Sequence, residues 1–113
     1  MVEFQTANMT LACTLITPNY IILDDPDGNV VENVVGATDI RFQTAVALEP
    51  QHGLKRLCSF ALTADSDEVL QHRLRAYRER RLFVSPKHYD ARKKILVAQV
   101  RVARTERTSD DDE

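Results

Sequence analysis

Apolar residues alternate with polar or small ones along much of the first 64 residues, the pattern of strands with one buried face. In residues 9–16 the alternate positions starting at Met9 are apolar, which predicts a strand. Residues 20–23 and 30–35 form two further apolar runs. The segment between them is rich in Asp, Pro and Gly, which favour tight turns, so a hairpin is expected there.

The clearest alternation lies in residues 39–49 and 54–64, which predict an antiparallel hairpin. The two runs have matched lengths, and only the loop 50–53 separates them. Short connections of this kind are typical of hairpins.

The period changes at Ser66, where a helix over 66–82 is expected. Ser66 is a favourable N-cap, and Asp67 and Glu68 suit the positive end of the helix dipole. Residues 86–92 are interpreted as a loop and residues 94–104 as a final strand. Residues 105–113 contain no apolar side chain and are expected to form a disordered acidic tail.

These elements predict a single α+β domain over residues 1–104. Its sheet is expected to be mostly antiparallel, with five or six strands, either open or curled into an open barrel. One main helix near 66–82 precedes the last strand. The expected core consists of the apolar positions on the inner phase of each segment: Leu11, Cys13, Leu15, Ile40, Phe42, Val46, Leu48, Phe60, Leu62, Leu70, Leu74, Leu96, Val100 and Val102.

The length of 113 residues fits one domain, and 43% apolar with 28% charged residues is ordinary for a globular protein. The net charge of −2 hides a strong segregation. Residues 1–71 have three basic and ten acidic side chains, residues 72–107 have twelve basic and three acidic ones, and residues 108–113 have four acids. Such segregation affects association with partners more than it affects the fold.

The basic stretch is the one candidate binding surface that the sequence contains. Arginine binds phosphates and carboxylates through paired donors, and aromatic side chains nearby offer stacking faces. The other interpretation is a solvated helix, or one whose arginines pair with acids of the same chain. The residues proposed to bind a partner are Arg73, Arg75, Arg78, Arg80, Arg81, Lys87, Arg92 and Lys93.

Most catalytic chemistries lack a sequence signature here. The two cysteines and three histidines have no metal-ligand spacing, and three glycines are too few for a phosphate-binding loop. The apolar runs are much shorter than the roughly 20 residues of a membrane span. We therefore expect a cytoplasmic protein that is not an enzyme, holds neither metal nor cofactor, and does not enter a membrane.

The first functional hypothesis is a non-catalytic assembly or adaptor protein that associates with its own copies, or with an acidic protein, through complementary acidic and basic faces. A ring-forming structural component of a virus-like particle is one example. The alternative is a nucleic-acid-binding module that uses the basic helix 72–83 and the loop 86–94.

Overall fold

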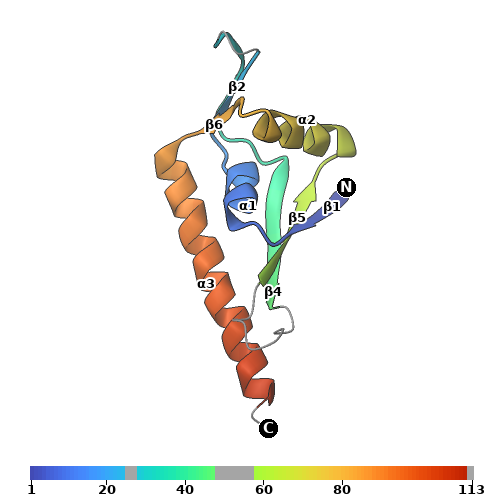
Figure 1. Cartoon of the computed structure of the whole chain (residues 1–113), viewed down its shortest axis with the longest axis vertical. Coiled ribbons are helices and arrows are strands. Elements are labelled where there is room, and N and C mark those ends of the chain that lie inside the picture. The colour runs from blue at the N-terminus through green and yellow to red at the C-terminus, as the bar shows by residue number, and fades with distance from the viewer. Residues whose placement is uncertain (25–27, 48–57, 112–113) are drawn as a thin grey trace.

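A computed structural model describes residues 1–24, 28–47 and 58–111, with the backbone alone described for residues 47 and 104–111. Figure 1 shows a long helix along one side of the molecule and β-structure on the other. The elements in chain order are β1 (Val2–Thr6), α1 (Met9–Ile16), β2 (Tyr20–Leu23), β3 (Val30–Val34), β4 (Ile40–Ala47), β5 (Cys58–Ala64), α2 (Asp67–Arg78), β6 (Leu82–Val84) and α3 (Pro86–Asp111).

The strands form two separate antiparallel sheets of three strands each, with the orders β1-β5-β4 and β3-β2-β6. The α+β class is thereby confirmed, whereas the expected single sheet of five or six strands is wrong for the described residues. They contain no barrel either. The sequence pattern did not reveal β1 and β6, because strands of three to five residues at sheet edges have little room for an alternating pattern.

Both predicted hairpins are confirmed as antiparallel pairs, β2 with β3 and β4 with β5. The expected loop 50–53 lies outside the described residues. In β4 the register shifts between Phe42 and Thr44. Such a bulge reverses the phase of the side chains beyond it, which is why Val46, predicted to be buried, is 52% exposed.

Residues 9–16 form helix α1 rather than the predicted strand. The side chain of Asn8 caps the helix by accepting from the backbone N–H of Leu11 at 3.1 Å. Within the helix, the hydroxyl of Thr14 donates to the carbonyl of Thr10 at 2.7 Å, and Thr17 just beyond it bonds Cys13 in the same way. Nearly every residue of this segment is apolar, and a short apolar run satisfies a buried helix as well as a strand.

Helix α3 replaces the predicted loop 86–92 and strand 94–104. Pro86 is the first residue of this helix, a position that suits proline. Leu96 and Val100, four residues apart, are buried, while Val102 is exposed. This is the helical phase and not the period of two. The helical backbone continues across residues 104 and 105, where a boundary between domain and tail is expected, and that division stays a prediction.

One core joins α1, β4, β5, α2 and α3, and a smaller one lies between α2 and the sheet β3-β2-β6. The first is built from Ala12, Cys13, Leu15, Ile16, Ile40, Cys58, Phe60, Leu62, Ala64, Leu70, Leu74, Leu96 and Val100. The second contains Tyr20, Ile22 and Ala76. Helix α2 thus packs against both sheets. This packing determines which of its basic side chains are buried and which are exposed.

Candidate functional site

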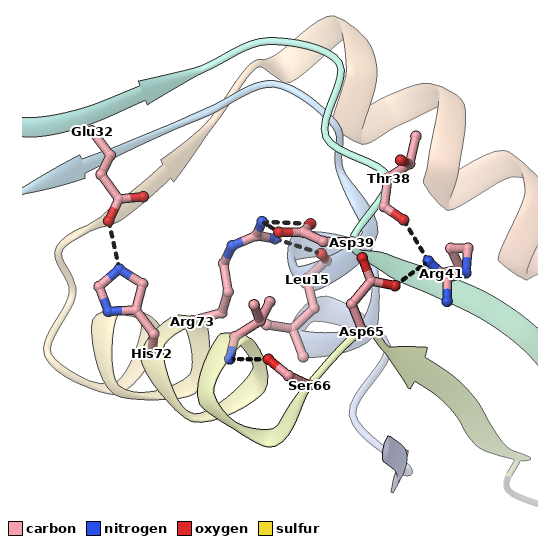
Figure 2. Close-up of polar contacts among 10 residues, drawn as sticks. Leu15, Glu32, Thr38, Asp39, Arg41, Asp65, Ser66, His72 and Arg73 are labelled. Atoms are coloured by element: carbon pink, nitrogen blue, oxygen red, sulfur yellow. Dashed lines mark hydrogen bonds and ion pairs between the residues drawn. The ribbon is translucent and has the colours of Figure 1, made fainter. Parts of the chain in front are cut away.

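Arg73 was expected on the basic surface, but it is buried, with only 2% of its side chain exposed. Its Nη2 donates to both carboxylate oxygens of Asp39 at 2.7 Å, and its Nη1 donates to the carbonyl of Leu15 at 3.4 Å (Figure 2). Its guanidinium carbon also lies 3.9 Å from the ring centre of Tyr20. Arg73 therefore ties α2 to α1, to β2 and to the segment before β4, and it is a structural residue.

Arg81 is also occupied within the chain. Its Nη1 donates to the carbonyl of Leu23 at 2.7 Å, and its Nη2 lies 3.2 Å from a carboxylate oxygen of Glu79. Its side chain is only one-fifth exposed. These contacts hold the end of α2 against β2, so Arg81 contributes little to a free basic surface.

Arg92 is half-buried on the side of α3 that faces β4. It lines a hollow of about 310 Å³ together with Phe42, Ile95 and Arg41. Arg41 has its own partners, because its Nη1 donates to Asp65 at 2.8 Å and to the carbonyl of Thr38 at 2.7 Å (Figure 2). Arg92 therefore lies on a different side of α3 from the basic residues that face outward.

The five other proposed residues are exposed, as expected, but they do not form one patch. Arg75 lines a hollow of about 560 Å³ together with Glu32, Asp67, Glu68 and His72. The lining of this hollow is largely acidic. The imidazole of His72 pairs there with Glu32 at 2.7 Å. Arg75 therefore lies in a different electrostatic environment from the residues that follow it.

Arg78 and Arg80 line an open hollow of about 790 Å³ between the end of α2, β6 and α1. Its lining, which we call the basic hollow, comprises Thr14, Tyr77, Arg78, Arg80, Leu82, Phe83 and Val84. Phe83 is 53% exposed, and the lining residues include two guanidinium groups and no carboxylate among the described side chains. The basic hollow therefore combines positive charge with an exposed aromatic ring.

Arg80 has a left-handed backbone with φ 60°, the one non-glycine residue of the described chain with positive φ. Its N–H donates to the carbonyl of Tyr77 at 3.1 Å, and the N–H of Arg81 donates to the carbonyl of Ala76 at 2.8 Å. These two bonds form the Schellman motif, which ends a helix and usually has glycine at the position of Arg80. They also end α2 at Arg78, four residues before the predicted end.

Helix α3 adds a row of positive charge along its outward side. Lys87, Lys94 and Arg101 recur every seven residues, so they lie on one face of the helix, and all three are exposed. Lys93, a proposed residue, is exposed beside this row. Lys94 and Arg101 were not among the proposed residues, because only a helical spacing places them on the same face. The expected basic loop 86–94 is part of this helix.

The outer face of the sheet β3-β2-β6 is apolar and uncovered. Ile21 of β2 and Phe83 of β6 lie opposite each other in the sheet, and both are exposed. Val31 and Val35 are exposed in β3 and just after it. Since β6 also borders the basic hollow, apolar and positively charged side chains lie next to each other at this end of the molecule.

The described residues show no arrangement typical of catalysis. His88 Nδ1 lies 3.0 Å from Ser85 Oγ, but no carboxylate of the described residues contacts this pair, and the other neighbour of the His88 ring is the amide of Asn19 at 3.4 Å. Both cysteines are buried, and burial raises the pKa of the Cys13 thiol. No three His, Cys, Asp or Glu side chains of the described segments are grouped as a metal would require. Among the helices of these segments none combines the length and the apolar character needed to cross a bilayer.

Comparison with known proteins identifies no relative of this chain. The chain matches no protein-family model, no curated protein and no solved structure. Any functional inference therefore rests on its own residues.

Proposed function

We propose that this chain is a non-catalytic assembly or adaptor protein that associates with other copies of itself through complementary acidic and basic faces. The observation that carries the proposal is the separation of exposed charge across the fold. Figure 1 places α3 on the opposite side of the molecule from β1 and the first turn of α2. Exposed cations gather on α3 and in the basic hollow, and exposed acids lie on β1 and the first turn of α2.

The acidic face consists of Glu3, Asp67 and Glu68, which are exposed. Two other acids of the described chain are paired with arginines: Asp39 binds Arg73, and Asp65 binds Arg41. Three exposed acids thus lie around the start of α2, whereas Asp90 is exposed on α3 beside Lys93 and Lys94. A surface with one sign of charge on each side is complementary to its own copy in a head-to-tail contact.

The uncovered apolar side chains support the same proposal. Charge complementarity steers encounter and sets orientation, but stable association also needs apolar surface to bury. Ile21, Phe83 and Val35 are exposed close to the basic hollow. They offer an apolar centre around which charged residues would form a rim.

Sedimentation velocity at low and at high salt tests this proposal. We expect the parent protein to associate at micromolar concentration in low salt and to dissociate as salt screens the charges. The reversal Asp67→Lys/Glu68→Lys should weaken this association, and Gln99→Lys, an exposed substitution on α3 away from these acids, is the control for added charge alone. A parent protein that is monomeric at both salt concentrations would contradict the proposal.

The row of cations on α3 favours a second candidate, a nucleic-acid-binding module. Lys87, Lys94 and Arg101 could contact phosphates, while Phe83 offers a stacking face. Engagement of about five phosphates of a duplex would give a log–log salt slope near −4 to −5. Titration of labelled single-stranded and double-stranded oligonucleotides at two salt concentrations distinguishes the candidates, and failure to bind at low salt rules this one out.

A further inference from the structure

We propose that the basic hollow binds the acidic segment 109–113 of a second copy of the chain. This inference rests on the proposed self-association and adds to it a contact that does not use the acidic face of Glu3, Asp67 and Glu68. The segment reads Ser-Asp-Asp-Asp-Glu, the densest acidic run of the sequence. The basic hollow, at the opposite end of α3, is the place where two exposed arginines and an exposed aromatic ring line the same concave surface.

The chemistry of the hollow fits carboxylates. Guanidinium groups bind carboxylates through parallel hydrogen bonds, which are stronger than bonds between neutral groups. The neighbouring acid, Glu79, lies 3.2 Å from Arg81 and is not part of the lining. Among the described residues neither Arg78 nor Arg80 has an ion-pair partner, so both guanidinium groups are available to a ligand.

The backbone of Arg80 is a second observation in favour of a ligand there. Glycine adopts a left-handed conformation without steric cost, whereas any residue with a Cβ is disfavoured. Arg80 holds this conformation although the helix end uses only its backbone N–H, which donates to the carbonyl of Tyr77. Side chains that cost stability in this way are characteristic of binding and catalytic positions.

The length of α3 implies that the acidic segment bound in the hollow belongs to another copy of the chain. The helix rises about 1.5 Å per residue, so Asp110 lies roughly 36 Å along the axis from Pro86. Only Ser85 separates Pro86 from β6, which lines the hollow. Residues 109–111 and β6, which lines the hollow, are therefore at opposite ends of α3 (Figure 1). Repeating the contact would join copies head to tail, into a ring if the rotation closes and into a filament if it does not.

Two variants, each damaged on one side of the contact, test this inference. The first neutralises the acidic segment through Asp110→Asn, Asp111→Asn, Asp112→Asn and Glu113→Gln. The second changes the hollow through Arg78→Gln/Arg80→Gly, and glycine at position 80 suits the left-handed backbone, so this variant should fold. Arg75→Gln, which removes an exposed arginine of α2 outside the hollow, is the matched control.

Sedimentation velocity at low salt should show that each variant associates at least about tenfold more weakly than the parent, since a hydrogen bond to a charged group contributes about 1.5–3 kcal/mol. The control should associate like the parent. A mixture of the two variants retains one intact hollow and one intact acidic segment per pair, so it should form one-to-one dimers and nothing larger. Thermal unfolding of each variant establishes that it is folded.

Several outcomes would overturn the inference. If the variant with the neutral segment associates as tightly as the parent, another surface makes the contact, and the proposed self-association stands without it. A mixture that stays monomeric while the parent associates would likewise show that another surface makes the contact. If the parent itself is monomeric, the proposed function and this inference both fail. Loss of oligonucleotide binding in the hollow variant, with association unchanged, would assign the hollow to nucleic acid.

Discussion

Replacing Arg73 with methionine should destabilise the protein strongly, because the guanidinium joins four segments of the chain. Methionine preserves an unbranched side chain but leaves Asp39 and the carbonyl of Leu15 without their donor. Removing one partner of a buried ion pair costs about 3–5 kcal/mol. The Asp39 side chain is 31% exposed, and water can therefore solvate part of its charge. We expect a loss of about 2–4 kcal/mol in the free energy of unfolding.

Urea unfolding followed by far-ultraviolet circular dichroism measures this loss. Arg75→Met is the matched control, since Arg75 is exposed on the same helix, and it should change the free energy of unfolding by about 0.5 kcal/mol or less. The double variant Arg73→Met/Asp39→Asn should lose less than the sum of its single variants, because the two residues are in contact. If Arg73→Met unfolds at the same urea concentration as the control, Arg73 is not the structural link described here.

Three further predictions concern α2, the core and the phase of α3. Arg80→Gly should raise the free energy of unfolding by about 1 kcal/mol by relieving the left-handed backbone, and a lower thermal midpoint would contradict this. Phe60→Ala should cost about 3–5 kcal/mol because Phe60 is buried, whereas Val102→Ala should cost less than about 0.5 kcal/mol, and equal losses in urea unfolding would show that α3 packs in another phase. The reversal Arg75→Glu/Arg78→Glu should change the free energy of unfolding by no more than about 1 kcal/mol while weakening association in sedimentation; loss of folding would show that these exposed arginines are structural.

Local signals in the sequence were sufficient for both hairpins and for the start of α2. Turn residues between two alternating segments specify a hairpin through backbone geometry alone. Ser66 Oγ accepts from the N–H of Val69 at 3.2 Å, the N-cap bond that the sequence predicts. Such features depend on neighbours along the chain, so they can be recognised without the fold.

Two apolar segments were assigned to the wrong kind of element for an identifiable reason. In residues 9–16 and 94–104 most positions are apolar, and alternate positions then suggest a strand even where every fourth residue faces the core. The caps were the better signal in both cases. Asn8 precedes α1, and Ser85 with Pro86 starts α3.

The candidate site illustrates what only the tertiary structure decided. The sequence predicted a basic stretch, but its side chains differ in environment: Arg73 is buried against Asp39, Arg75 lies among acids, and Arg78 and Arg80 share a hollow with Phe83. These differences depend on residues that are far away in the chain, such as Asp39. Charge is a property of each residue and can be counted along the sequence. Which charges are neutralised, and which remain exposed beside an aromatic ring, depends on packing between segments, because ion pairing and burial are set by distances in space.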